Sequence, residues 1–291
     1  MIATRIRAPE RATDASVHAH RLRGFHQENL LVDKKTMATS EVVGAVEARL
    51  PFRFPREAVL VLLAFAALWQ IVSFFVPPFV VPGLERIWNS LLSLRYDFVL
   101  VTLARVLAAL LISFVLGIAL AVAMYLWPTF ERYFRPLVRL LMAVPVVCWI
   151  LFSVLWFKWV EFRIAFVLIV VCAPVFIVDF LDGMKGVPQE LRAMLKSFRP
   201  NRAQFFTKLL LPATLPAILT SWKINLSLAI RVVTIAELVG AISGVGYGLV
   251  LAQELFSVAD VFAWTVILVI ILFVLEALLT RVEMHMLRWR T

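Results

Sequence analysis

Cysteine and histidine are scarce in this 291-residue sequence, which holds two cysteines and four histidines. Both cysteines, Cys148 and Cys172, lie within apolar runs, so no disulfide framework is indicated. Three of the histidines, His18, His20 and His26, precede the apolar region and lack the cysteine or carboxylate framework of a metal site. A solvated polar tail accounts for them better than a metal site does, and we expect no bound metal.

Two motifs of enzymatic sites are also missing. No G-x-x-x-x-G-K-[ST] occurs, so the chain is not expected to bind ATP through a P-loop. No H-E-x-x-H occurs either, which removes that form of zinc site. All four histidines lie at the termini, so Ser243 has no histidine in the apolar region with which to form a catalytic dyad. An intramembrane enzyme is therefore the function class least compatible with the sequence.

Charged residues are few, at 16%, whereas hydrophobic residues make up 62% and the mean hydropathy is +0.92. This composition excludes an ordinary soluble protein and indicates an all-α polytopic membrane protein. A membrane-spanning helix needs about 20 predominantly apolar residues. Six spans meet this criterion: 57–76, 98–126, 138–157, 163–181, 213–236 and 260–280.

Two local patterns add detail to these spans. Residues 84–94 form a short amphipathic pattern with Trp88 as an aromatic anchor, which predicts a helix at the membrane interface. Within the second span, Ser113, Gly117 and Ala121 recur every four residues. Such a row of small side chains permits close contact with another helix.

Two regions follow from the distribution of charge: a polar, largely disordered tail over 1–56 and a transmembrane domain over 57–291. Lys and Arg number 22 in the tail, the 127–139 connection, the loop at about 185–210 and the C-terminus, against four in the other connections. By the positive-inside rule this bias places both termini and the loop in the cytoplasm. It also explains the net charge of +10 without a nucleic-acid partner.

The loop carries an amphipathic pattern of its own. Apolar residues recur at helical spacing from Leu191 to Phe198. Pro200 lacks an amide hydrogen and clashes with a preceding helical turn, which predicts a short helix, a corner and a second helix start. From these residues alone, the loop is either an ordinary connection between spans or a surface for a partner.

Three stretches carry a resemblance to a known family. They are Thr102-Leu103-Ala104-Arg105, RLLMAVPVVCWILFSVLWF over 139–157 and AELVGAISGVGY over 236–247. Together with Glu190-Leu191 and Leu211-Pro212 of the loop, they resemble permease subunits of ABC importers of the nitrate/sulfonate/taurine type, over about residues 57–290. The resemblance implies a type I importer permease fold with six transmembrane helices and a cytoplasmic coupling helix.

In that family the loop docks into a groove on the ATPase. Here Ala193 stands at the usual glutamate of the loop motif, Met194 and Leu195 at two alanines, and Arg199 at the glycine. The resemblance assigns coupling to the following residues: Glu190, Leu191, Ala193, Met194, Leu195, Ser197, Phe198, Arg199 and Arg202.

The resemblance also implies partners and a place in the cell. The chain is expected to be no enzyme and to bind no cofactor, with ATP and Mg²⁺ held by two copies of a cytoplasmic ABC ATPase. A second permease copy or a paralogue, a periplasmic substrate-binding protein and membrane lipid complete the expected surroundings. The location implied is the bacterial inner membrane, and the mechanism is alternating access for a small, anionic solute whose identity the sequence does not specify.

Six residues are candidates for the substrate pathway: Arg105, Pro145, Trp149, Lys223, Arg231 and Glu237. Ionisable side chains inside spans are costly and usually face a protein interior or a water-filled cavity. For Pro145 and Trp149 helix packing is an equal alternative. Lys223 is expected to have a structural role, and Glu237 to organise the glycine-rich turn that follows it. Arg231 either contacts an anionic substrate or pairs with a carboxylate, for which the candidates are Glu276, Glu237 and Asp179.

An outer gate is predicted at the glycine-rich stretch, with these residues: Gly240, Ser243, Gly244, Gly246 and Tyr247. Glycines there permit sharp turns, and a re-entrant connection buried in protein is the alternative to a gate. A secondary transporter remains the second function class, although neither an inverted repeat nor paired broken helices mark the sequence.

Overall fold

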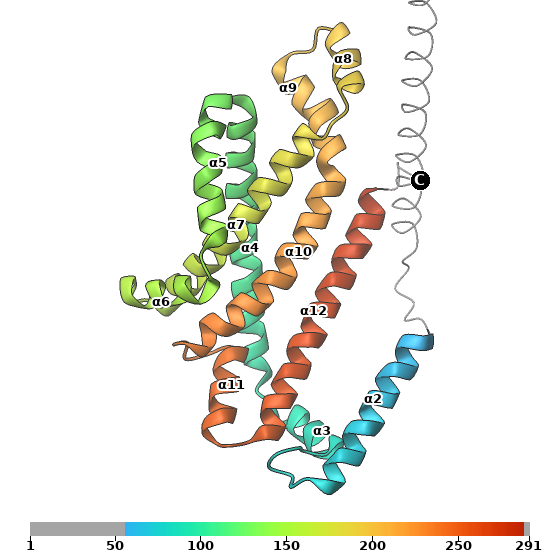
Figure 1. Ribbon diagram of the computed structural model, residues 1–291, viewed down its shortest axis with the longest axis vertical. Coiled ribbons are helices and arrows are strands. Elements are labelled where there is room, and N and C mark those ends of the chain that lie inside the picture. Colours follow the sequence, from blue (N-terminus) through green and yellow to red (C-terminus); the bar gives the residue numbers. More distant parts are fainter. Residues whose placement is uncertain (1–55, 288–291) are drawn as a thin grey trace, which may run out of the picture. The chain divides into compact units, whose positions relative to one another are not determined.

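The computed structural model describes residues 56–287, apart from the side chains of 202 and 203. The predicted tail over 1–56 therefore lies outside the described residues, except for Arg56. The contacts described below belong to the unit Leu62–Thr291. The elements are α2 Arg56–Phe75, α3 Leu84–Ser93, α4 Tyr96–Leu126, α5 Pro128–Ala143, α6 Val146–Trp156, α7 Val160–Lys185, α8 Gln189–Ser197, α9 Arg202–Phe205, a π-helical turn Phe206–Leu210, α10 Leu211–Leu238, α11 Val245–Glu254 and α12 Val258–Met286 (Figure 1).

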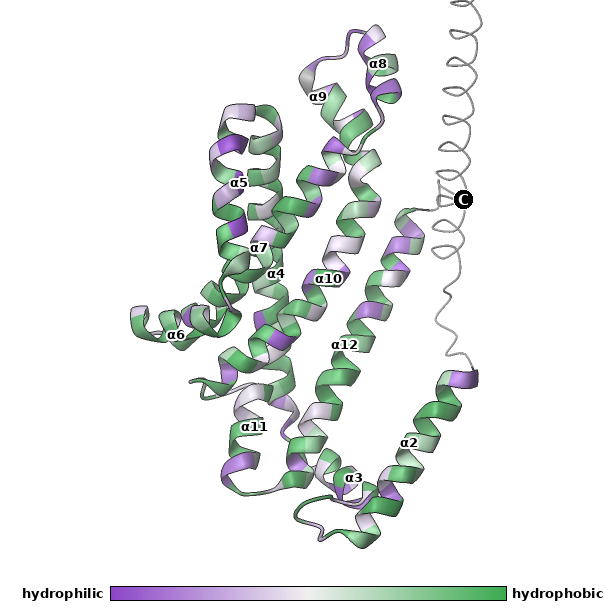
Figure 2. Ribbon diagram, viewed as in Figure 1, coloured by the Kyte–Doolittle hydropathy of each residue, from purple (hydrophilic) through white to green (hydrophobic). Residues whose placement is uncertain are grey.

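The described residues contain no strand, which agrees with the predicted all-α class. Five helical stretches are long and apolar enough to span a membrane: α2, α4, α7, Phe206–Leu238 and α12. Hydrophobic residues cover most of their length (Figure 2). They correspond to five of the six predicted spans, and the predicted short helix at 84–94 is α3.

The remaining predicted span, 138–157, is not one continuous helix. It is divided between α5 and α6, which meet at an angle of 94°. Pro145 is the residue before α6, with φ −57° and ψ 137°. A proline disfavours helical geometry in the residue before it, and Val144 is accordingly extended, with φ −74° and ψ 126°. The bent pair makes a sixth span only if both helices are counted together.

The core lies where α4, α7 and α10 pack against one another. The predicted row of small residues on α4 is buried there. A Cβ atom on Gly117 would lie 2.5 Å from Cβ of Phe176 on α7. Phe176 also packs edge-on against Trp222 of α10, with ring centroids 5.6 Å apart. The glycine thus sets the close approach of α4 to α7.

We expect Gly117→Ala to destabilise the protein by about 1–3 kcal/mol, because the methyl group would overpack this contact. The measurement is thermal unfolding of the purified protein in mild detergent. Gly83→Ala is the matched control, since its Cβ would meet nothing nearer than Oγ of Ser73 at 3.6 Å. Equal unfolding temperatures for the two variants would show that α4 and α7 can separate without cost.

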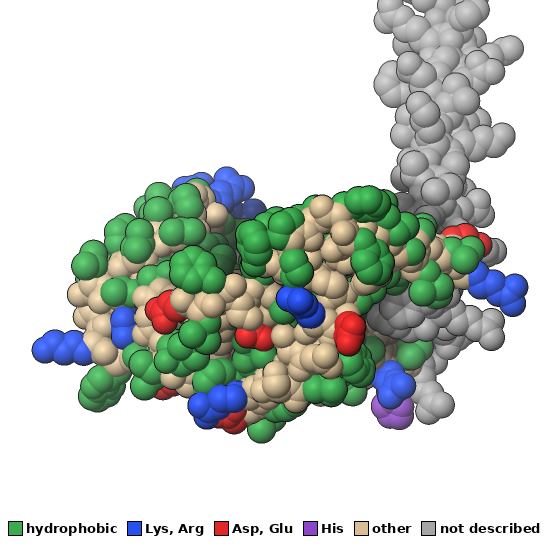
Figure 3. All heavy atoms as spheres, turned by 90° about the horizontal axis from the view of Figure 1, so that it is seen from below, with side chains coloured by type: hydrophobic (Ala, Val, Ile, Leu, Met, Phe, Trp, Pro, Cys, Tyr) green, Lys and Arg blue, Asp and Glu red, His purple; other side chains and the backbone are tan. Residues whose placement is uncertain are grey.

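The two ends of the long helices carry different elements (Figure 1). One end carries α8 and α9 and is called here the α8 end. The other carries α3 and α11 and is called the α11 end. Seen from the α11 end, hydrophobic side chains predominate, with acidic and basic ones scattered among them (Figure 3).

Candidate functional site

The connection between α10 and α11 is pressed against the side chain of Glu237. Gly244 has φ +108°, in the region that favours glycine, and a Cβ there would lie 2.4 Å from the Glu237 carboxyl group. A Cβ on Gly246 would lie 2.5 Å from Cβ of Glu237. Gly240 has φ +153°. The two glycines that face Glu237 therefore let the backbone approach a carboxylate that is itself 0% exposed.

That carboxylate accepts hydrogen bonds from three residues on two helices. Oγ1 of Thr102 on α4 donates at 2.9 Å, and the backbone N–H of Gly246 on α11 donates at 2.9 Å. Nη1 of Arg105 on α4 donates at 2.7 Å. A buried carboxylate is tolerated only when it is paired and hydrogen-bonded in this way.

Arg105 extends the same network to α7 and to the loop. Its Nη1 donates to the carbonyl of Ser243 at 2.7 Å, and its Nη2 donates to Oγ of Ser243 at 3.0 Å. On its other side, Nε donates to Glu161 of α7 at 2.8 Å and Nη2 also pairs with Glu161. Oγ1 of Thr102 meanwhile accepts from the N–H of Val245 at 2.8 Å. We call Thr102, Arg105, Glu161, Glu237 and Ser243 the Glu237 cluster.

The Glu237 cluster clamps the loop to α4, α7 and α10. Two of the predicted pathway residues, Arg105 and Glu237, therefore form an ion pair with each other. Glu237 also organises the turn, as expected, because it accepts a hydrogen bond from Gly246. Sequence reasoning missed Glu161 and the role of Thr102. The available signal was the spacing of Thr102 and Arg105, which puts both on one face of a helix.

Two further gate and pathway candidates, Tyr247 and Trp149, pack against aromatic rings. Tyr247 lies edge-on to Phe98, at 5.8 Å. Trp149 packs against Phe152 and Phe166 at 6.0 and 6.4 Å. Pro145 immediately precedes α6 and is exposed.

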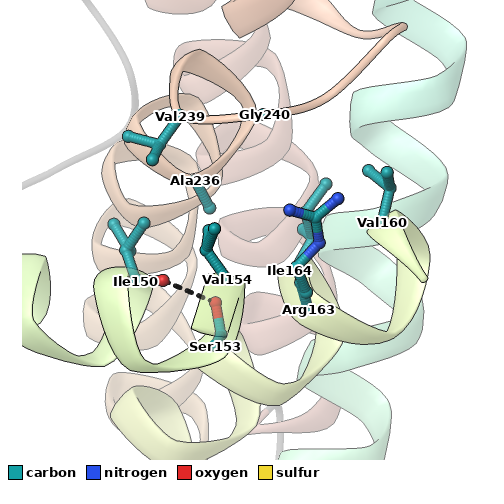
Figure 4. Close-up of a pocket in the computed structure, with 9 residues that line it drawn as sticks. All are labelled: Ile150, Ser153, Val154, Val160, Arg163, Ile164, Ala236, Val239 and Gly240. Atoms are coloured by element: carbon teal, nitrogen blue, oxygen red, sulfur yellow. Dashed lines mark hydrogen bonds between the residues drawn. The ribbon is translucent and has the colours of Figure 1, made fainter. Parts of the chain in front are cut away.

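A small cavity lies beside Gly240, where α6, α7 and the end of α10 meet (Figure 4). It holds about 10 Å³, and Ser153 at its edge donates to the carbonyl of Ile150 at 2.7 Å. The guanidinium of Arg163 lies at the cavity (Figure 4). Such a volume is about one water molecule, so the cavity is too small for a transported solute.

The two cationic candidates on α10 differ in their surroundings. Lys223 pairs with Glu283 of α12, which agrees with the structural role expected for it. Arg231 is exposed, and none of the ion pairs within residues 56–287 includes it. The alternatives in which Arg231 pairs with Glu276, Glu237 or Asp179 are wrong for the described residues, because no ion pair joins Arg231 to any of these carboxylates.

At the opposite end, α8 presents an apolar surface. Leu191, Met194 and Phe198 are 41%, 59% and 76% exposed, and their spacing of three and four residues sets them on one face. We call these three residues the α8 stripe. Leu195, also predicted to couple, is half-buried instead.

The position of α8 depends on Arg192. Its Nη2 donates to the carbonyls of Met184 and Lys185 at 2.7 and 2.9 Å, at the end of α7. A guanidinium there satisfies carbonyls left free at a helix C-terminus and complements the helix dipole. This contact ties α8 to a spanning helix.

The remaining loop candidates surround the corner. Glu190 and Ala193 are exposed on α8, and Oγ of Ser197 donates to the carbonyl of Met194 at 2.6 Å. Arg199 has φ +48°, a left-handed conformation that favours glycine, at the position where the resemblance expects glycine. Arg202 begins α9, and its side chain lies outside the described residues.

Comparison with known proteins gives one matching family model, "Binding-protein-dependent transport system inner membrane component", over residues 113–288. The chain is 27% identical to the taurine transport system permease protein of Escherichia coli, over 83% of this chain and 94% of that protein. It is 28% identical to the formylaminopyrimidine transport permease protein of Halalkalibacterium halodurans, over 80% and 96%. Among solved structures, a chain of the inward-facing methionine ABC transporter MetNI matches with a TM-score of 0.58 and 18% identity, over 64% of this chain and 92% of that one.

Proposed function

Because the chain belongs to the family of binding-protein-dependent transport system inner membrane components, we propose that it forms half of the translocation pathway of an ATP-driven importer. The chain is a multi-pass membrane protein with the type I importer permease fold. In the proposed complex, a second copy or a paralogue supplies the other half. Two ABC ATPase subunits bind ATP and Mg²⁺, and a periplasmic binding protein delivers the solute.

The single observation that carries the coupling role is the α8 stripe. Three large apolar side chains stand exposed on a short helix at one end of the spanning helices. Lys and Arg concentrate in the loop that holds α8, in the 127–139 connection and in the sequence of the two termini, which supports a cytoplasmic position for the α8 end and for both termini. An apolar face outside the hydrocarbon region is suited to a protein partner, and the partner in this family is the ATPase.

We propose a small anion as the solute. Related permeases carry in their names taurine, aliphatic sulfonates, nitrate and bicarbonate. Taurine is zwitterionic and bears a sulfonate, and the other three are anions. Formylaminopyrimidine, the solute named for another relative, is uncharged.

Two measurements test this function. The full-length chain, purified from its native membrane in mild detergent, is expected to have the mass of a complex with two permeases and two ATPases. In proteoliposomes with the binding protein, the complex is expected to take up solute only when ATP is supplied on the α8 side. A lone monomer that moves solute without an ATPase would contradict the proposal.

A further inference from the structure

Arg231 lies well inside a membrane span and is exposed on the surface of the single chain. It precedes Leu238, the last residue of α10, by about two helical turns, or roughly 10 Å along the axis. Its neighbours on the same face, Ile224, Ile235 and Leu238, are exposed and apolar, at 51%, 36% and 37%. The opposite side of α10 is buried against α4, α7, α11 and α12.

Two other cations inside the spanning helices, Arg105 of α4 and Lys223 of α10, are neutralised by ion pairs. Arg105 is paired with Glu161 and Glu237. Lys223 is paired with Glu283. Arg231 differs from both in having no carboxylate partner within residues 56–287.

An uncompensated guanidinium at this depth is expensive. It stays charged at any physiological pH, and charged residues inside a span are rare unless they meet water or an opposite charge. Because residues 56–287 supply no opposite charge to Arg231, compensation comes from water or from a charge outside these residues. Three sources of an opposite charge are available: a solute in the pathway, a carboxylate of a partner chain, or the phosphate of a lipid.

We propose that Arg231 contacts the anionic group of the transported solute, a sulfonate or an oxyanion, in the pathway between two permeases. This inference rests on the proposed function. The planar guanidinium can donate two parallel hydrogen bonds to such a group. The apolar residues around Arg231 keep other polar contacts away, so that an anion gains more from this site than a neutral solute does.

The experiment uses the complete importer in proteoliposomes, with taurine, nitrate, bicarbonate and formylaminopyrimidine as solutes. Uptake per assembled complex is compared between wild type and three variants. Arg231→Gln removes the charge, and Arg231→Lys keeps the charge but loses the planar fork. Arg86→Gln is the matched control, because Arg86 is exposed on α3 at the α11 end and has no described ion pair.

For an anion or taurine taken up by the wild type, Arg231→Gln is expected to lower uptake at limiting solute by roughly 10- to 100-fold, the range for a lost charge-assisted hydrogen bond. Arg231→Lys should lose less, and Arg86→Gln should match the wild type. Assembly should be normal in all three variants, because Arg231 has no ion-pair partner among residues 56–287.

Three outcomes would overturn the inference. Unchanged uptake per complex in Arg231→Gln would show that water or a lipid phosphate, and not the solute, compensates Arg231. Loss of assembly in Arg231→Gln, with assembly retained in Arg231→Lys, would assign it to a carboxylate of a partner chain. ATP-dependent uptake of formylaminopyrimidine and of no other solute would show that the transported solute has no anionic group for Arg231 to contact. If no variant and no wild type shows ATP-dependent uptake of any solute, the proposed function itself fails and this inference falls with it.

Discussion

Replacing Glu237 by glutamine will destabilise the folded protein by about 3–5 kcal/mol, the range for breaking a buried ion pair by changing one partner. The new amide group would turn a donor toward the N–H of Gly246 or the guanidinium of Arg105, both of which are donors themselves. Arg105, only 7% exposed, would lose its buried carboxylate. Unfolding in mild detergent, followed by tryptophan fluorescence, measures the effect.

Glu161→Gln is the matched control for this prediction. The substitution is the same and the arginine partner is the same, but the Glu161 side chain is 69% exposed. Exposed ion pairs contribute about 0–1 kcal/mol, so this variant should unfold close to the wild type. Equal destabilisation by the two substitutions would show that burial does not set the strength of the Glu237 cluster.

Replacing Met194 by aspartate is expected to reduce ATP-driven solute uptake by roughly 30-fold or more. A buried anchor at a protein interface contributes about 2 kcal/mol or more, and each 1.4 kcal/mol is a factor of ten. Met194 lies at the centre of the α8 stripe and is 59% exposed, so the aspartate is tolerated in the free chain and opposes docking. Uptake in proteoliposomes and co-purification of the ATPase measure the two parts of the effect.

The control for Met194→Asp is Gln189→Glu. It adds the same charge to the exposed start of α8, on the face opposite the stripe. Co-purification and uptake at wild-type levels are expected for this control. If instead Met194→Asp transports like the wild type, the α8 stripe is not the coupling surface.

Most of the fold could be predicted, because a membrane-spanning helix is recognised from the length and hydropathy of its sequence. Residues 98–126 were expected to span, and α4 is Tyr96–Leu126. Over 138–157 the same criterion did not reveal the bend between α5 and α6. Hydropathy measures how apolar a segment is and carries no information about the backbone direction at Val144 and Pro145. The corner at Pro200 was predictable, because a proline lacks the amide hydrogen and clashes with the preceding turn of the same helix.

The sites were predictable in position but less so in pairing. Sequence spacing placed Leu191, Met194 and Leu195 on one apolar side of a helix. The period of 3.6 residues per turn does not show which of these side chains packs against the rest of the chain and which is exposed. Leu195 turned inward, whereas Met194 is exposed. Likewise Arg105 and Glu237 were both recognised as costly charges, but 132 residues separate them, and no local rule joins two such distant positions.

That separation matters while the chain is being made. Arg105 leaves the ribosome 56 residues before Glu161 and 132 residues before Glu237. At about 5–20 residues per second, its guanidinium waits roughly 3–11 s for the first carboxylate and roughly 7–26 s for the second. Glu161, the weaker partner in the finished protein, is thus the earlier of the two to arrive. Until α7 emerges, the Arg105 guanidinium therefore has neither carboxylate of the Glu237 cluster, and the hydrogen bond from Gly246 to Glu237 forms only after α10 is made.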